Sequence, residues 1–171
     1  WFVELNKNDK GLNGRTPIWA KPGVNVAEWK KIKVPGAWED QGVDVDGVVW
    51  MRKQVNVPRE MLDKPNYLEL GLIDDIDTTY LNGVALGTKN NRYLERRYQI
   101  PNGLLKAGEN VIAVRVVDKE GKRGIIPGKQ YRLGNDHWAD PDLSHTRILP
   151  RWQVGRCKPN TRGNVSRPRL G

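Results

Sequence analysis

The chain has 171 residues and carries 29 Lys and Arg against 20 Asp and Glu, a formal net charge of +9. Its single cysteine, Cys157, excludes an internal disulfide and a cysteine-based zinc site. No apolar run approaches the ~20 residues that span a bilayer, so we expect no membrane partner. The chain begins at Trp1 without an initiator methionine, so we expect it to be a fragment of a longer protein.

Most of the positive charge lies after residue 121. Residues 1–121 carry 18 Lys and Arg and 17 Asp and Glu, whereas residues 122–171 carry 11 and 3. The pI near 9.8 therefore describes the last segment, and we expect no nucleic-acid partner. We predict an N-terminal extension or lead-in strand over 1–24, a folded body over 25–121, and a basic, poorly ordered tail over 122–171. The abrupt change in residue usage suggests either a shifted reading frame or a genuine extension that packs on another domain.

The first clear strand pattern covers residues 49–57 and ends before Pro58, which lacks a backbone donor. Side chains alternate between the two faces of a strand, so Trp50, Arg52 and Gln54 share one face. The opposite face is apolar and consists of Val49, Met51, Val55 and Val57.

Three later segments also have strand patterns. Residues 67–73 place Leu68, Leu70 and Leu72 on one face. Residues 78–86 contain Asn82-Gly83, a dipeptide typical of type I′ turns, so we expect a hairpin with an exposed tip. Residues 109–118 are apolar on nearly both faces, which predicts a central strand. Short strands without alternating helices predict an all-β sandwich or barrel.

Several of these segments together resemble a known family. They are residues 29–42 (WKKIKVPGAWEDQG), 46–53 (DGVVWMRK), 71–83 (GLIDDIDTTYLNG) and 104–118 (LLKAGENVIAVRVVD). Over roughly residues 25–121 they resemble the jelly-roll sandwich of family 2 glycoside hydrolases, usually called the sugar-binding domain. The paired aspartates of the hairpin resemble the version embedded in sialate O-acetylesterases, in which the sandwich accompanies an SGNH-type catalytic domain.

This resemblance implies an antiparallel jelly-roll β-sandwich of the galactose-binding-domain type. It also implies a non-catalytic, carbohydrate-binding accessory domain of an esterase that removes acetyl groups from sialic acids. The partner would be a glycan or the SGNH-type domain, and the parent would be exported to the periplasm or the outside of the cell. Two alternatives are the sugar-binding domain of a family 2 glycoside hydrolase and a purely structural scaffold.

The residues themselves provide little for catalysis. Asp142 and His145 match the Asp-x-x-His element of SGNH esterases, but the chain contains no Gly-Asp-Ser. Neither Ser144 nor Ser166 lies in a Gly-x-Ser-x-Gly elbow. We therefore interpret the match as a coincidence and expect the chain alone to have no catalytic activity.

Three aspartates of the hairpin are the first candidate binding group. The carboxylates of Asp74, Asp75 and Asp77 would suit Ca²⁺ or sugar hydroxyls, and we expect no other cofactor or metal. Catalysis is a weaker alternative, because the resemblance places glycosidase carboxylates in a separate barrel domain. In the structural alternative the aspartates cap strand ends or form ion pairs with Arg52, Arg96 or Arg115.

Aromatic and cationic side chains are the second candidate group. Sugars stack their C–H faces on aromatic rings, and their hydroxyl groups bind carboxylates, amides or guanidinium groups. Trp38 begins a polar loop, while Trp50 and Arg52 face away from the apolar side of their strand. Arg92 lies in a polar loop after the hairpin. The alternative is that the tryptophans pack in the core and the loop is a solvated connection.

Overall fold

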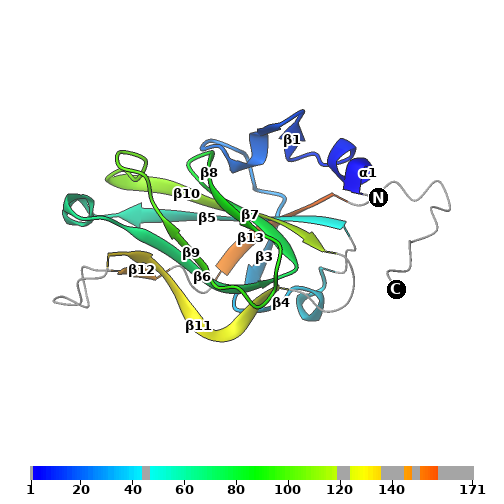
Figure 1. Ribbon diagram of the computed structural model, residues 1–171. Helices are drawn as coiled ribbons and strands as arrows, with labels where there is room; N and C mark the ends of the chain where they lie inside the picture. Colours follow the sequence, from blue (N-terminus) through cyan, green and yellow to red (C-terminus); the bar gives the residue numbers. More distant parts are fainter. Residues whose placement is uncertain (1, 44–46, 119–123, 136–144, 148–150, 158–171) are drawn as a thin grey trace.

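The computed structural model describes residues 2–43, 47–118, 124–135, 145–147 and 151–157 (Figure 1). Within these ranges, a six-stranded sheet has the order β3-β13-β5-β10-β7-β8. A second sheet joins β12, β11, β6 and β9, and β4 pairs with β11. The strands of the first sheet are β3 (Lys30–Lys33), β13 (Arg151–Cys157), β5 (Gly47–Val57), β10 (Gly108–Asp118), β7 (Ile76–Leu81) and β8 (Val84–Lys89). Those of the second are β4 (Gly36–Ala37), β6 (Tyr67–Asp74), β9 (Arg96–Gln99), β11 (Gly124–Gly134) and β12 (His145–Arg147).

The two sheets pack on each other around one apolar core, and their strands pair antiparallel. The predicted antiparallel jelly-roll sandwich is therefore confirmed. Short 3₁₀ helices connect some strands, namely η2 (Glu39–Gln41) and η3 (Arg59–Asp63). Among the described residues, no helix is both long and apolar enough to cross a membrane.

Strands β5 and β10 form the centre of the larger sheet. They pair along their whole lengths, with Met51 opposite Val114. The alternation predicted for β5 is confirmed, because Val49, Met51, Val55 and Val57 all belong to the core between the sheets. The central position predicted for β10 is also confirmed, since β5 and β7 flank it.

The predicted face of β6 is wrong at its last residue. Leu68 and Leu70 enter the core as expected, but Ile73 joins them in place of Leu72. The pairing of β6 with β9 changes register between Glu69 and Gly71. A bulge of this kind shifts the side-chain alternation by one residue, which moves Leu72 out of the core.

The hairpin of β7 and β8 has the expected turn, with φ of 50° at Asn82 and 87° at Gly83. Its tip, however, is half-buried and not exposed. The Asn82 amide donates to Leu104 O at 3.1 Å and to Asn110 Oδ1 at 2.8 Å, and its oxygen accepts from Val111 N at 2.8 Å. These bonds hold the turn against the start of β10 and the segment before it.

The sandwich continues beyond the predicted boundary at residue 121. Strand β11 pairs with both β6 and β4, and its Ile125 and Leu133 are buried in the core. Farther along the basic segment, β12 pairs with β11, and β13 lies between β3 and β5. Charge composition misplaced the boundary because strand pairing depends on backbone groups, which are the same whatever the charge of the side chains. Asp142 and Ser144 lie outside the described residues.

Residues 2–21 cover the outer face of the six-stranded sheet, where the prediction was an extension or a lead-in strand. They form α1 (Phe2–Lys7), the two-residue strands β1 (Leu12–Asn13) and β2 (Thr16–Pro17), and η1 (Ile18–Ala20). Asp9 links this N-terminal cover to the larger sheet by two hydrogen bonds. Its Oδ1 accepts from Trp50 Nε1 on β5 at 2.8 Å, and its Oδ2 accepts from Arg115 Nε on β10 at 2.6 Å. A second apolar cluster fills the space beneath the N-terminal cover.

The bulge in β6 yields a testable prediction at Gly71, whose φ is +63°. A Cβ there would lie 2.8 Å from Tyr131 Cε1 and 2.9 Å from Lys129 Cβ. Gly103 has a φ of +77° but has nothing within 4 Å of a Cβ, which makes it a matched control. In urea unfolding we expect Gly103→Ala to lower the free energy of unfolding by about 1–2 kcal/mol. Gly71→Ala should cost about 1–3 kcal/mol more, because crowding adds to the backbone strain. Equal losses would contradict the close packing of β11 over Gly71.

Candidate functional site

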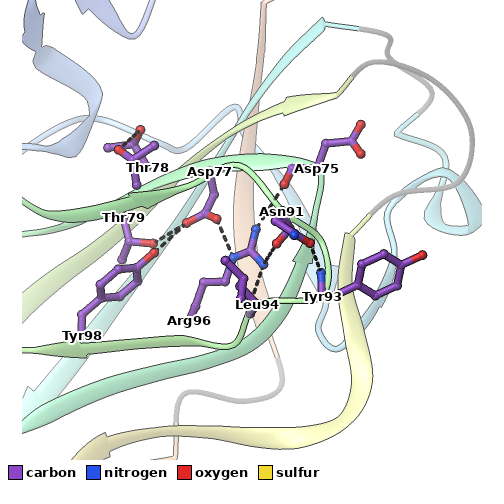
Figure 2. A network of polar contacts seen from close by, with 10 residues as sticks. Asp75, Asp77, Thr78, Thr79, Asn91, Tyr93, Leu94, Arg96 and Tyr98 are labelled. Atoms are coloured by element: carbon purple, nitrogen blue, oxygen red, sulfur yellow. Dashed lines mark hydrogen bonds and ion pairs between the residues drawn. The ribbon is translucent and has the colours of Figure 1, made fainter. Parts of the chain in front are cut away.

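A buried ion pair joins the two sheets at one edge of the sandwich (Figure 2). Arg96 begins β9 in the smaller sheet, and Asp77 lies on β7 in the larger one. Arg96 Nε donates to Asp77 Oδ1 at 2.6 Å, and both side chains are completely buried. Asp77 Oδ2 also accepts from Thr79 Oγ1 at 3.1 Å and Tyr98 OH at 3.3 Å. Burial raises the pKa of Asp77, and the charge of Arg96 opposes that shift.

The same guanidinium group holds the loop 90–95 between β8 and β9. Arg96 Nη1 donates to Asn91 O at 2.9 Å and Leu94 O at 2.6 Å, and Nη2 donates to Asp75 O at 3.2 Å. Asn91 Oδ1 accepts from Tyr93 N at 2.8 Å. The loop therefore has a fixed backbone, although Tyr93 is 78% exposed.

The three candidate aspartates do not converge on one point. Asp77 points toward Arg96, and Asp74 forms an ion pair with Arg92 at 3.2 Å. The Asp75 carboxylate points away from the network in Figure 2. Among the described residues, no group of three His, Cys, Asp or Glu side chains is placed to hold a metal ion. The predicted calcium site is therefore not formed by the described residues, because neighbouring arginines neutralise two of its three carboxylates.

The other candidate side chains are buried, with the exception of Arg92. Trp38 is 0% exposed and belongs to the core between the sheets. Trp50 faces away from that core as predicted, but the N-terminal cover buries it completely. Arg52 donates from Nη1 to the carbonyl oxygens of Trp19 and Lys21 in the same cover. Neither Trp38 nor Trp50 thus offers a free ring face to a sugar, because packing uses both.

A groove of about 530 Å³ lies on the outer side of the smaller sheet, next to the ion pair. Sequence analysis missed it. Four residues of β11, between Ile126 and Tyr131, lie opposite the single residue Gly71 of β6, so β11 bulges there by three extra residues. The groove lies between this bulge and β9. Its lining residues are Glu69, Gly71, Glu95, Arg96, Arg97, Gly128 and Lys129.

Charged side chains of both signs form the walls of the groove. Glu69 accepts from Arg97 Nε at 2.9 Å and also binds the Arg132 guanidinium group. Lys129 Nζ lies 2.8 Å from Glu95 Oε1, and this carboxylate raises the pKa of Lys129. The cationic side chains can donate charge-assisted hydrogen bonds to a ligand, and the carboxylates can accept them. This combination suits a ligand with hydroxyl groups and a negative charge.

A sequence signal for part of this site did exist. Arg96 occupies an inward position of β9, in line with the buried Tyr98 and Ile100. A charged residue at an inward position needs a buried partner of opposite charge, and Asp77 is that partner. The pairing of an aspartate with Arg96 was one of the structural alternatives considered above. The groove had no comparable signal, because residues 127–130 lay beyond the predicted body.

Comparison with known proteins identifies related sequences and folds. No family model matches the chain. It is 29% identical over 127 residues to one protein of Formosa agariphila, covering 67% of this chain and 12% of that protein. It is 27% identical over 111 residues to a second, covering 57% and 11%. The second is named a β-glucuronidase, and the first is provisionally assigned the same name. A tRNA U34 carboxymethyltransferase of Edwardsiella ictaluri is 24% identical over 156 residues, 85% of this chain and 46% of that enzyme.

Three solved structures with this fold are glycoside hydrolases. A family 2 member from Bacteroides cellulosilyticus has a TM-score of 0.54 at 20% identity, over 62% of this chain and 17% of its own. The Bacteroides uniformis β-glucuronidase has a TM-score of 0.54 at 21% identity, over 84% and 16%. The Bifidobacterium dentium β-glucuronidase, complexed with coumarin-3-O-glucuronide, has 0.51 at 20% identity, over 80% and 26%. In each case the chain matches a minor part of a much longer hydrolase.

These matches correct the resemblance to sialate O-acetylesterases, which is wrong. The two Formosa agariphila relatives and the three structural neighbours described above are named as β-glucuronidases or family 2 glycoside hydrolases, and none of them supports an SGNH-type partner domain. The motifs described the sandwich correctly, but they carry no information about the catalytic domain that accompanies it. The expectation of an exported parent followed from the same resemblance and loses its basis with it.

The two neighbouring arginines of β9 give a prediction about stability. Arg96→Ala leaves Asp77 buried without its counter-charge, so we expect the free energy of unfolding to fall by about 3–5 kcal/mol. Arg97→Ala breaks a pair in which the arginine is 47% exposed, and we expect a loss below about 1 kcal/mol. Urea unfolding of both variants measures the difference. Similar losses would show that the Asp77–Arg96 pair is not the main polar contact at this edge.

A second prediction concerns alkaline pH. Burial and the negative charge of Asp77 raise the pKa of Tyr98 above its usual 10.0. As pH rises, the unfolded chain therefore loses the Tyr98 proton before the folded chain does, so stability is full below the unfolded pKa of ~10 and falls above it. The contribution of Tyr98 to this slope is at most ~1.4 kcal/mol per pH unit.

Urea unfolding at a series of alkaline pH values measures that slope. Tyr98→Phe should reduce it but not remove it, because burial also raises the pKa of Tyr80. The unsubstituted chain, measured over the same pH range, is the reference for this reduction. An unchanged slope in Tyr98→Phe would refute the contribution of Tyr98.

Proposed function

We propose that this chain is the non-catalytic β-sandwich domain of a longer glycoside hydrolase that acts on β-glucuronides. The observation that carries the proposal is the sequence similarity to the two Formosa agariphila proteins, which extends over 67% and 57% of this chain. The fold supports it, because the same sandwich occurs in solved family 2 hydrolases and β-glucuronidases. None of the solved structures described above is a tRNA-modifying enzyme.

The state of the buried carboxylates supports a non-catalytic role for this chain. Glycoside hydrolysis requires two carboxyl groups ~5–9.5 Å apart that both face the substrate. Among the described residues, the four buried carboxylates each bind an arginine side chain; they are Asp9, Glu69, Asp74 and Asp77. These acids balance buried or half-buried charge in the sandwich, so the catalytic pair would belong to another part of the longer protein.

The experiment compares this chain with the product of the complete reading frame that encodes it. We expect the complete protein to release nitrophenol from 4-nitrophenyl β-D-glucuronide, and the 171-residue chain alone to release none. The 4-nitrophenyl ester of acetic acid tests the esterase alternative with both proteins. Turnover of the glucuronide by the chain alone would contradict the non-catalytic role. Esterase activity without glucuronidase activity in the complete protein would contradict the proposed substrate.

A further inference from the structure

We propose that the groove on the smaller sheet is a binding site for a uronic acid residue, with Lys129 and Arg97 recognising its carboxylate and Glu69 and Glu95 accepting from its hydroxyl groups. The groove lies on the outer face of the smaller sheet of this sandwich. The choice of a uronate among carboxylated ligands rests on the proposed function, whereas the groove itself follows from the structure.

The backbone creates the space for a ligand. The bulge of β11 rises opposite Gly71, where a side chain would collide with Tyr131 and Lys129. Gly128 at the tip of the bulge has nothing within 4 Å of a Cβ position, so that wall is open. The volume of about 530 Å³ falls within the ~300–1,000 Å³ of small-molecule sites. The absence of a side chain at Gly128 lets a sugar ring approach the backbone of the bulge closely.

One ion pair at the groove is weak enough to exchange its carboxylate for that of a ligand. Arg97 and Arg132 both bind Glu69, which is nearly buried. The remaining pair, Lys129 with Glu95, is on the surface, with 42% and 60% of their side chains exposed. Exposed pairs of this kind are weak, so a ligand carboxylate can replace Glu95 at the ammonium group at little cost. Arg96 is neutralised separately by Asp77.

The cationic wall is held in place before a ligand arrives. The guanidinium carbon of Arg97 lies 4.1 Å from the centre of the Tyr67 ring, which supports it from one side. Glu69 orients the same group from a position that is only 8% exposed. A side chain fixed in this way loses little conformational freedom on binding, which favours affinity.

The test is a titration of the 171-residue chain with methyl β-D-glucuronide, followed by nuclear magnetic resonance at the backbone amides. The neutral control is methyl β-D-glucoside, which differs only in the carboxylate. We expect the glucuronide to bind about tenfold more tightly than the glucoside, with the largest shifts at Gly71, Gly128 and Lys129. Lys129→Gln should weaken glucuronide binding about tenfold. Lys106→Gln removes an exposed lysine away from the groove and should leave it unchanged.

Three results would overturn the proposal: no saturable binding of the glucuronide, equal binding of the glucoside, or equal binding of inorganic phosphate at the same sites. The last would identify a general anion site without sugar recognition. Each of these results leaves the domain assignment intact, because that assignment is tested by the activity of the complete reading frame. Conversely, binding at the groove would persist in the isolated chain even if the complete protein hydrolysed another glycoside.

Discussion

The ion pair between Asp77 and Arg96 is the constraint on which one whole edge of this sandwich depends. It joins the larger sheet to the smaller one in a place where both side chains are excluded from water. A buried pair gains little net free energy, because removing two charges from water offsets most of their attraction. The pair instead determines the arrangement of the backbone segments around Arg96. The guanidinium group must satisfy its donors, and it donates to one carboxylate and to three backbone carbonyls.

Those carbonyl contacts extend the influence of the pair to its surroundings. Two of them fix the loop 90–95, and a third holds the residue before β7. Glu95 and Arg97, on either side of Arg96, line the groove. The buried ion pair and the polar groove therefore lie next to each other. Side chains alternate between the two faces of the sheet at this segment, so Arg96 points inward and its neighbours point outward. Loss of Arg96 would therefore disturb the groove as well as the fold.

Local patterns predicted the fold well, because alternation and turn chemistry act over a few residues. The two faces of β5, the central position of β10 and the turn at Asn82-Gly83 all followed from such patterns. Non-local packing was the source of the errors. Nothing in the alternation of β5 shows that a segment 30–40 residues earlier covers Trp50 and Arg52. The bulges of β6 and β11 likewise depend on how two distant strands meet around Gly71.

The candidate site was predicted only in part. Sequence reasoning selected the aspartates for their clustering, but their roles depend on arginines that lie up to 19 residues away. The groove was missed because its bulge follows residue 121, where a change in charge was interpreted as the end of the fold. The incorrect resemblance to sialate O-acetylesterases had a different origin. Motifs of a sandwich that several enzyme families share carry no information about the catalytic domain beside it. Composition describes solubility and charge, whereas strand pairing depends on the backbone.

The N-terminal cover has a consequence for spectroscopy. Trp19 and Trp29 lie edge to face with ring centres 4.9 Å apart, and Trp50 stacks on Tyr80 at 5.7 Å beneath the same cover. Trp38, by contrast, is buried between the sheets. Indole emission from these four tryptophans therefore reports on two separate places. If the cover detaches before the sandwich unfolds, as terminal segments often do, fluorescence will change while the far-ultraviolet circular dichroism of the sheets persists.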